Sequence, residues 1–449
     1  MKYDVVVIGG GVSGLATGAL LAKQGKRVVV IEKGNQPGGR AYTYEEKGFT
    51  LNYGPHAVYR PQSGFLADLM GRLDKPVPKH GYPDPIRSYW ADGDRFGAVG
   101  AKPHQLLATH LFPLGSRIAL ARMFLKLRGA KPDAVADDVT WGEWVASVTS
   151  DERVRRFANA LATVNTYTRP AANLSARFVL SAVQRNVFAK DYVGYMYGGW
   201  RTMYEAFIEV LTSDDRSGAL ISGARVERLE TDAAGHVTAA IAGDARYEAD
   251  TFVCTLPPQD APTLAAPGSA LAAELAQWDT LEDVRAFCMD LGFSRRLRDD
   301  LTYVFDINDD LYYSLHSEIA TDLAPAGGLL MHAMAYLSPE EAADEALLAA
   351  RKAALIAGLD RHFSGWREAL VVERTLPNVR VVCARSTPQQ FGRNRVPLRS
   401  SAAPNLYFAG DGRDLPLNLS EICFVSAMEV ADALASAAPA AAVSTTAVG

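Results

Sequence analysis

Two features of the sequence predict an α/β fold built from interleaved domains. Near the N-terminus, the apolar runs 4–8 and 27–31 flank a glycine-rich turn and a helical segment, which is typical of parallel strands buried on both faces. Further along the chain, strand-like segments return around residues 223–254 and 284–337. A chain of 449 residues is too long for one ordinary core, so two or three domains are expected.

The glycine-rich turn has the spacing of a dinucleotide-binding site. Gly9, Gly11 and Gly14 form G-x-G-x-x-G directly after the first strand. The first glycine permits a tight turn, the second lets the backbone approach a pyrophosphate, and the third lets the next helix pack on the strand. Val12 and Ser13 open that helix, whose free amide groups would face the phosphates.

The second strand supplies an acidic residue for the ribose. The helix is expected to end near Lys23, and Glu32 ends the next strand, roughly 20 residues beyond the glycines. A carboxylate there accepts hydrogen bonds from ribose hydroxyls and favours an unphosphorylated ribose, and Lys33 is assigned to the same site. The alternative is a turn without a ligand. Because strand, helix, second strand and acid occur in the required order, a dinucleotide is predicted.

Two further motifs resemble those of FAD enzymes of the amine oxidase and phytoene desaturase superfamily. Within that group, the segment 281–337 and its missing lysine look most like the phytoene desaturase-related oxidoreductases. Gly38-Gly39-Arg40 follows Glu32 in the manner of the E-(x)n-G-G-R signature of that group. The resemblance implies that FAD is the cofactor and that Gly39 and Arg40 run along its pyrophosphate. A forked guanidinium suits a diphosphate better than lysine does. The implied fold is a Rossmann-like FAD-binding domain of the glutathione reductase type, with an interleaved α+β substrate domain bearing a helical cap.

Gly54-Pro55-His56 resembles the G-P-H turn of the same group, whose backbone approaches the flavin ring. Two interpretations of the His56 side chain remain open, a catalytic role and a loop histidine that caps its own turn. The three segments 223–229, 236–241 and 247–254 are similar to the small meander of the family. There the resemblance implies that Val226 contacts adenine through its backbone.

The C-terminal region resembles the second FAD signature. A strand within 404–411 ends in Gly410-Asp411, where Asp411 would accept from a ribityl hydroxyl or reach the pyrophosphate through water. Glu421-Ile422 stands where many relatives have Glu-Gly, so an isoleucine replaces a glycine at the cofactor. With Ser420 as the N-cap residue, the following helix would direct its positive end at the flavin N1 and C2 carbonyl.

The segment 284–337 should form strands of the substrate domain, expected at residues 285–291, 302–305, 311–315 and 328–336. Their aromatic residues and methionines suit an apolar substrate chamber and are equally compatible with ordinary core. Amine oxidases of the superfamily usually carry a lysine at the start of the first strand, where this chain has Arg285, which argues against a plain amine oxidase. Near the flavin signatures the sequence shows no paired carboxylates and no His–acid motif, so no proton-transfer dyad is predicted.

Helices are expected in the cap and on the surface. Residues 103–128 form one basic amphipathic helix or a pair broken near 113–115. Two interpretations stand, a core-facing helix with a solvated face and a helix resting on an anionic membrane. Further cap helices are expected at 140–144, 151–163 and 174–187, and a long surface helix at 339–363.

The expected domains interleave along the chain. The FAD-binding domain takes three parts, the substrate domain takes two, and the alanine-rich tail is expected to be disordered. The FAD-binding parts are 1–72, 195–265 and 376–436, the helical cap and substrate parts are 73–194 and 266–375, and the tail is 437–449.

Composition excludes some partners. Lys+Arg 46 against Asp+Glu 51 gives a net charge of −5, which provides no basic field for nucleic acid. The four cysteines are isolated, without metal-ligand spacing, and favour free thiols in the cytoplasm. The N-terminal apolar run is too short to span a bilayer and carries the glycine motif, so neither a transmembrane helix nor a signal peptide is expected there. The mature chain is expected to begin at Met1 and to be cytoplasmic, or peripheral at the inner face of a membrane.

These features predict an FAD-dependent oxidoreductase that takes hydride from a C–H bond of a small apolar or amphipathic substrate, as a desaturase or isomerase similar to phytoene desaturases. Two alternatives remain, a flavin amine oxidase acting on a small amine and a redox-silent FAD protein that binds a partner. The motifs are specific for FAD and leave the substrate, the electron acceptor and the oligomeric state open.

Overall fold

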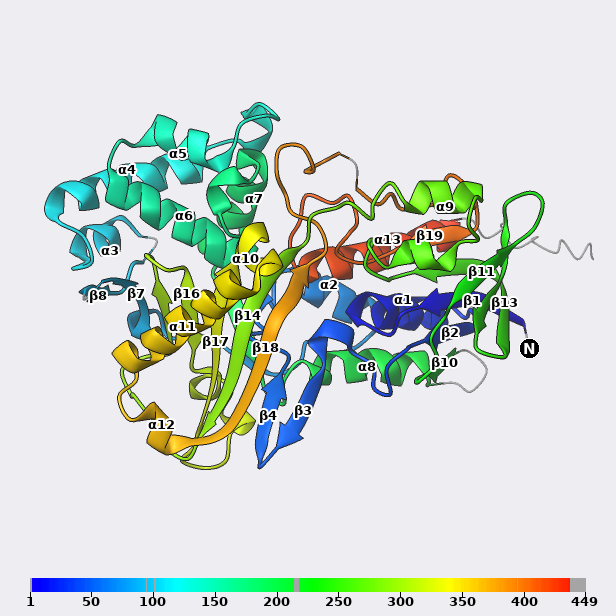
Figure 1. Cartoon of the computed structure of the whole chain (residues 1–449), viewed down its shortest axis with the longest axis horizontal. Helices are drawn as coiled ribbons and strands as arrows, with labels where there is room; N and C mark the ends of the chain where they lie inside the picture. Colours follow the sequence, from blue (N-terminus) through cyan, green and yellow to red (C-terminus); the bar gives the residue numbers. More distant parts are fainter. Residues whose placement is uncertain (1, 94, 101, 214–217, 394, 437–449) are drawn as a thin grey trace, which may run out of the picture.

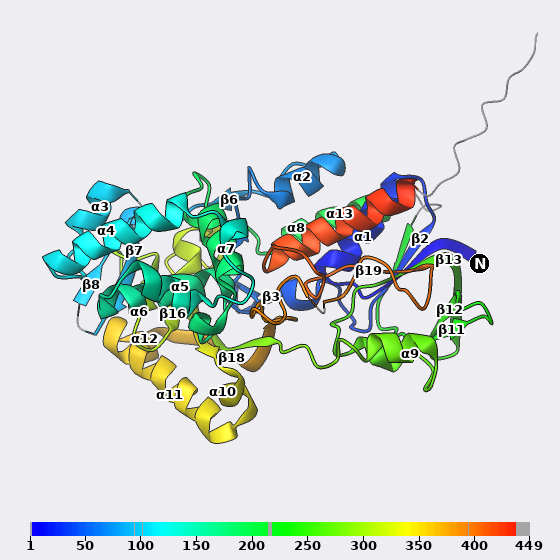
Figure 2. The same ribbon diagram turned by 90° about the horizontal axis from the view of Figure 1, so that it is seen from above.

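The computed structural model describes residues 2–93, 95–100, 102–213, 218–393 and 395–436. Two seven-stranded sheets lie at opposite ends of an elongated molecule, and each carries its own helices (Figures 1 and 2). The tail expected to be disordered, 437–449, lies outside the described residues. Among the described helices, none combines the length and the apolar content needed to cross a bilayer.

The first sheet has the strand order β10-β2-β1-β13-β12-β11, with β19 paired to β13. Strands β10, β2, β1, β13 and β19 pair in parallel, and β11 and β12 add an antiparallel meander. The strands are β1 Lys2–Ile8, β2 Val28–Ile31, β10 Gly218–Ile221, β11 Arg228–Thr231, β12 Val237–Ala242, β13 Ala245–Cys254 and β19 Leu406–Phe408.

Both faces of the first sheet are buried at its centre, because the paired residues 5–8 of β1 and 28–31 of β2 are all apolar. Val5 and Val7 pack under the helices on one face, whereas Val6 and Ile8 pack into a second cluster on the other. The helices on the first face are α1 Val12–Lys23, α2 Phe65–Arg72, α8 Arg201–Leu211 and α13 Ser420–Ser436, and α9 Ala270–Leu275 lies on the second. The expected helix 12–23 is confirmed at both ends.

The second sheet has the order β18-β14-β17-β16-β15-β7-β8, and every pair except β15–β7 is antiparallel. The four strands expected between 284 and 337 are all present. Strand β18 continues past the boundary expected at residue 375. The strands are β7 Ser88–Asp92, β8 Arg95–Gly97, β14 Val284–Phe293, β15 Tyr303–Asp306, β16 Leu311–Ser314, β17 Leu329–Leu337 and β18 Leu370–Val382.

Helices cover the second sheet on both faces. One face packs against α11, because Leu355 and Leu359 meet Met289 and Ala333. The other face packs against the cap helices (Figure 2). The helices are α3 Pro103–Ala108, α4 Leu114–Gly129, α5 Trp141–Val148, α6 Glu152–Thr166, α7 Ala176–Val187, α10 Pro339–Ala343, α11 Glu345–His362 and α12 Trp366–Ala369.

Two of the expected helical segments are each divided into a pair of helices. The basic segment 103–128 was expected to form one helix or a broken pair, and it forms a pair in which residues 109–113 separate α3 from α4. The single helix expected over 339–363 is wrong, because Asp344 ends α10 and caps α11 by accepting from the amides of Ala346 and Leu347.

Short strands connect the two sheets. Strand β4 ends at Asn52 and leads into the turn at residues 52–56, which lies between the two large units. The short strands are β3 Thr43–Glu46, β4 Phe49–Asn52, β5 Val58–Tyr59, β6 His80–Gly81 and β9 Val193–Met196.

Candidate functional site

The N-terminal glycine turn has the shape expected of a phosphate cradle. Gly9 has φ +106°, and a Cβ atom at Gly14 would lie 1.9 Å from the Gly9 carbonyl oxygen, so neither position tolerates a side chain. At Gly11 a Cβ atom would meet no described atom within 4 Å, which leaves the backbone open to a ligand. Helix α1 begins at Val12 and Ser13, with Gly11 as its N-cap residue. The open glycine and the helix amides fit a pyrophosphate.

Glu32 joins the glycine turn to the end of β2. Its Oε2 accepts from the Gly10 amide at 2.7 Å, and its Oε1 accepts from the Gly34 amide at the same distance. Lys33 is exposed beside it. Both oxygens of the Glu32 carboxylate are therefore oriented by backbone amides at the edge of the glycine turn.

Val226 follows a segment that is bonded to Glu32 and Gly34, and the strand predicted for it is wrong in its first half. Strand β11 begins at Arg228, because the Ala224 amide donates to the Glu32 carbonyl at 2.9 Å instead of to a neighbouring strand. The Gly223 amide likewise donates to the Gly34 carbonyl at 2.8 Å. Val226 itself is 8% exposed.

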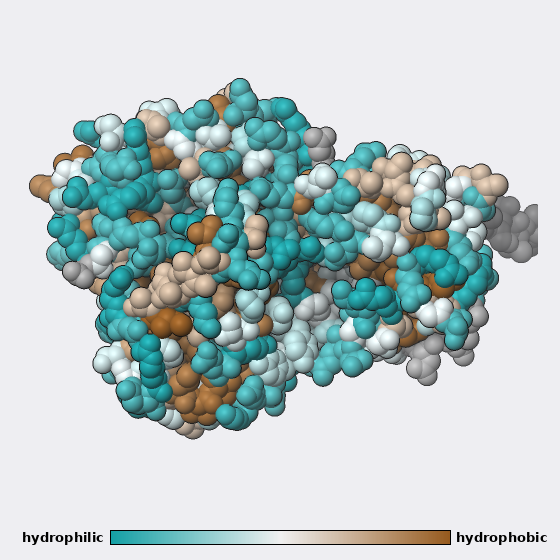
Figure 3. Space-filling view, in the orientation of Figure 1, coloured by the Kyte–Doolittle hydropathy of each residue, from teal (hydrophilic) through white to brown (hydrophobic). Residues whose placement is uncertain are grey.

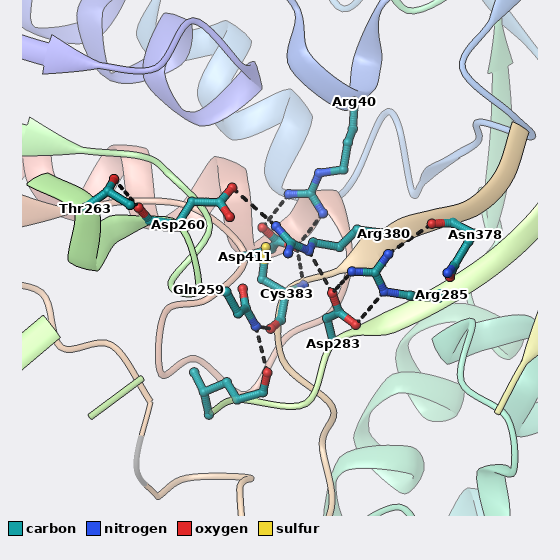
Figure 4. Close-up of polar contacts among 11 residues, drawn as sticks. Arg40, Gln259, Asp260, Thr263, Asp283, Arg285, Asn378, Arg380, Cys383 and Asp411 are labelled. Carbon is teal, nitrogen blue, oxygen red and sulfur yellow. Dashed lines mark hydrogen bonds and ion pairs between the residues drawn. The ribbon is translucent and has the colours of Figure 1, made fainter. Parts of the chain in front are cut away.

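The second glycine turn packs on the first. The Gly38 amide donates to the Gly10 carbonyl at 2.8 Å, and Gly39 has φ +56°. Arg40 follows and projects toward Asp411, to which its guanidinium donates two hydrogen bonds of 2.8 and 2.6 Å (Figure 4). The side chain of Arg40 is still 37% exposed. It therefore keeps donors for a phosphate while Asp411 fixes its orientation.

Asp411 is a buried anion supported from several sides. Its Oδ2 also accepts from the Cys383 amide at 2.9 Å, and the preceding Gly410 has φ +122°. Burial disfavours the charge of Asp411, but Arg40 and these hydrogen bonds outweigh burial and hold its pKa below the usual value. Arg380, which the sequence did not single out, points into the same region and pairs with Asp283 at 2.7 Å (Figure 4).

The Gly54–His56 turn lies between the two sheets. Gly54 has φ +89°, and a Cβ atom there would contact the Cys288 Sγ of β14 at 3.4 Å. Pro55 follows, and the His56 ring packs edge-on against Trp200 with 4.7 Å between centroids. The His56 Nδ1–H donates to the Gly54 carbonyl at 3.0 Å, since a carbonyl can only accept. Burial lowers the pKa of His56 to about 4, so the ring is neutral at neutral pH.

The start of α13 differs from the expectation. Ser420 is the first helical residue rather than the N-cap residue, and Leu419 before it has φ +51°, a strained conformation for leucine. Glu421 is 2% exposed and pairs with Arg60 at 2.7 Å and with Arg185 at 3.5 Å. Ile422 is 1% exposed. The side chains of Glu421 and Ile422 are thus held within the protein.

Beneath the Gly54–His56 turn the described structure contains a buried His–acid pair that sequence reasoning missed. His332 Nδ1 is hydrogen-bonded to Asp290 Oδ1, and both residues are 0% exposed. The pair lies on strands of the second sheet, outside the segments of the flavin signatures, so the expectation that those segments carry no proton-transfer dyad stays a prediction. The two residues are 42 positions apart in sequence, so only the pairing of β14 with β17 brings them together.

Arg285 does not stand in for the missing lysine. Its guanidinium donates to both oxygens of Asp283 at 2.9 Å and to the Asn378 carbonyl at 3.0 Å. The side chains facing the Gly54 turn are instead those of Cys288 and Asp290. The sequence of β14 contains no lysine.

Comparison with known proteins gives a family match across most of the chain. The family model described as flavin-containing amine oxidoreductase matches residues 12–435. The all-trans-retinol 13,14-reductase of Macaca fascicularis is 44% identical over 79 residues, which cover 16% of this chain and 13% of that protein. The lycopene-forming phytoene desaturase of Pantoea ananas is 26% identical over 257 residues, which cover 50% of each chain. The chain thus matches half or less of the length of these curated relatives.

The fold also occurs among solved structures. An oxidoreductase from Methanosarcina mazei superposes with a TM-score of 0.78 at 19% identity, over 96% of this chain and 100% of that one. This likeness supports the two-sheet α/β architecture described above.

Proposed function

We propose a reaction for this protein on the premise that the chain belongs to the family of flavin-containing amine oxidoreductases, as an FAD-dependent oxidoreductase. The proposed reaction is removal of hydride from a C–H bond of an apolar or amphipathic substrate, in the manner of a desaturase or isomerase. The proposed domains are the interleaved FAD-binding and substrate units expected from the sequence.

The residues of the first sheet fit FAD. Gly11 and the α1 N-terminus would hold the pyrophosphate together with Arg40, Glu32 would hold the ribose, and the Gly54–His56 turn would lie against the ring. When bound, FAD supplies a two-electron acceptor for hydride. The task left to this chain's own side chains is to bind the substrate, exclude water and accept a proton.

The observation that carries the proposal is a buried cluster of tyrosines between the cap and the second sheet. The Tyr195 and Tyr312 hydroxyls are 2.8 Å apart, and the Tyr167 and Tyr336 rings lie 5.7 Å apart. Tyr59 belongs to the same cluster. Burial raises the pKa of each hydroxyl, so the cluster stays uncharged. Such a surface suits a hydrocarbon that carries few polar groups better than a charged amine.

His56 is the proposed catalytic residue. Its Nδ1–H is committed to the Gly54 carbonyl, so in the neutral ring Nε2 carries the lone pair. A pKa of about 4 makes His56 a weak base. A weak base suffices here, because loss of hydride from one carbon makes a hydrogen on the neighbouring carbon strongly acidic.

The cap offers a route for an apolar substrate. On α4 the side chains of Leu114, Ile118 and Leu125 are 66%, 42% and 64% exposed, and their spacing places them on one stripe. Exposed cations flank the stripe at Arg122, Lys126 and Arg128, and the α4 sequence contains no acidic residue. Arg117 differs from these three cations because its guanidinium is bound to the protein, where Nε donates to the Phe112 carbonyl at 2.7 Å.

The α4 stripe lies on the outer surface of the cap end of the molecule, where apolar side chains are visible (Figure 3). The opposite side of α4 packs through Leu120, Phe124 and Leu127 into the cluster that includes Tyr312 and Tyr336. We therefore propose that α4 rests on an anionic membrane at the inner face, with its buried side toward the tyrosine cluster.

The direct test is anaerobic flavin reduction. Polyprenoid and polyketide-like compounds should bleach the bound flavin, whereas small amines should not. His56→Gln should bind the same compounds and slow the bleaching. Bleaching by amines alone would make the protein an amine oxidase, and a flavin that no compound bleaches would support the redox-silent partner-binding alternative.

A further inference from the structure

Four polar side chains form one row across the second sheet. Asp290 of β14 lies directly opposite His332 of β17 on one side and Arg374 of β18 on the other. His332 in turn lies opposite Ser314 of β16. The register therefore aligns Arg374, Asp290, His332 and Ser314 across four neighbouring strands.

The row is buried and centred on one carboxylate. Asp290 Oδ1 is bonded to His332 Nδ1, while Asp290 Oδ2 accepts from Arg374 Nε at 2.9 Å. Asp290, His332 and Ser314 are 0% exposed. Burial alone would favour the protonated acid, but His332 and Arg374 outweigh it and hold the pKa of Asp290 below its usual value.

Both ends of the row leave the sheet and bind the same short turn. At one end Arg374 Nη2 donates to the Asn52 carbonyl, and its guanidinium lies 5.3 Å from the centre of the Tyr53 ring. At the other end Ser314 Oγ is 2.8 Å from His316 Nδ1, and His316 Nε2 is 3.1 Å from the His56 carbonyl.

The protonation of His316 follows from these partners. A carbonyl can only accept, so Nε2 carries the hydrogen and donates it to His56. Burial lowers the pKa of His316 well below its usual value, so the ring is neutral and its Nδ1 accepts from the Ser314 hydroxyl. Because the contact is made to the backbone of His56, the row fixes a position and does not carry a proton to the His56 ring.

We propose that the row from Arg374 to Ser314, together with His316, positions the residue 52–56 turn against the flavin ring. The proposal rests on the assignment of this turn to the flavin, as in the proposed function, but not on any particular substrate. The hydrogen bonds form two groups, Arg374–Asp290–His332 and Ser314–His316, and each group ends on a carbonyl group of the same turn. The His332 and His316 rings join the two groups by packing edge-on, with 4.4 Å between centroids. Asp290, Arg374 and His316 are accordingly positioning residues. They lie in the substrate domain and fix the position of the residue 52–56 turn.

The test uses the FAD-bound protein without substrate. His316→Phe removes the donor to the His56 carbonyl, whereas His316→Gln keeps an N–H near the Nε2 position. We expect His316→Phe to alter the visible absorption and circular dichroism of the bound flavin and to speed FAD release about tenfold, the effect of losing one buried hydrogen bond. His316→Gln should restore most of both properties. Asp290→Asn should act in the same direction as His316→Phe.

The matched control is Tyr313→Phe. Tyr313 is also fully buried, follows Tyr312 on β16, and donates to the Leu355 carbonyl at 2.9 Å on the opposite face of the sheet. The Tyr313→Phe variant should have a lower melting temperature than the wild type and an unchanged flavin spectrum. A folded His316→Phe protein with a wild-type flavin spectrum and a wild-type rate of FAD release would overturn the proposal. This outcome is independent of whether any substrate reduces the flavin.

Discussion

Arg40 and Asp411 are bound by two parallel hydrogen bonds of 2.8 and 2.6 Å although 371 residues separate them. This pair connects the second glycine turn to the segment before α13, the two places where the sequence resembles FAD signatures. Arg40 also donates to the Val381 carbonyl at 2.9 Å, at the end of β18. One guanidinium therefore joins both FAD segments to the second sheet.

Arg40→Lys should weaken FAD binding by about 1.5–3 kcal/mol, the range for hydrogen bonds to charged groups. Lysine keeps the charge but cannot hold a carboxylate with two donors while facing a phosphate. Titration of the apoprotein with FAD measures the change. Arg285→Lys is the control, because Arg285 also makes two bonds to a carboxylate and is comparably exposed. If both variants bound FAD as tightly as the wild type, the assignment of Arg40 to the FAD diphosphate would be wrong.

Glu32→Ala should weaken FAD binding by about 1–3 kcal/mol, because buried ribose hydroxyls and the Gly10 and Gly34 amides would lose their acceptor. Asp4→Ala is the matched control. Its carboxylate accepts from the Arg27 amide at 2.7 Å, at the other end of the same two strands. The control should change stability and not FAD affinity, as measured by fluorescence titration. Equal losses of affinity in the two variants would contradict the assignment of Glu32 to the ribose.

Elements that a local motif specifies could be predicted from the sequence. Side-chain contacts that depend on the register between distant strands could not. The approximate bounds predicted for helix α1 are confirmed, because three glycines and the flanking strands constrain it. The Asp290 row was missed because Asp290 and Arg374 are 84 residues apart, and their alignment depends on irregularities in the pairing of β14 with β18. Alternation along β14 places the side chains of Cys288 and Asp290 on the sheet face that is turned toward residues 52–56. The composition of this segment gives no sign of that placement.

Acid should destabilise the protein through two histidines that are neutral in the fold. Burial lowers the pKa of His56 to about 4 and holds that of His316 well below its usual value. The unfolded chain takes up protons below about pH 6.5, where the folded chain does not, so stability is full above that pH and falls as the pH drops toward 4. Each histidine contributes at most about 1.4 kcal/mol per pH unit. Denaturant unfolding with saturating FAD across this range measures the slope.

The control for the acid prediction is substitution of the same two residues. His316→Gln and His56→Gln should each flatten the dependence of the unfolding free energy on pH between about 6.5 and 4. Replacement of His236, which is half exposed at the surface, should leave the slope unchanged. If both variants kept the wild-type dependence of the unfolding free energy on pH, the burial of these two neutral rings would not be its cause.

The α4 stripe predicts salt-dependent membrane binding. Each cation near an anionic surface contributes about 1 kcal/mol, so Arg122→Glu with Lys126→Glu should release the protein from anionic liposomes in co-sedimentation at low salt. Arg225→Glu with Lys352→Glu makes the same change in net charge at exposed positions outside α4 and should stay bound. High salt should weaken the wild type but not abolish its binding, because Leu114 and Leu125 bury apolar surface. A wild-type protein that stays in the supernatant at low salt would remove the membrane route and favour a substrate taken from water.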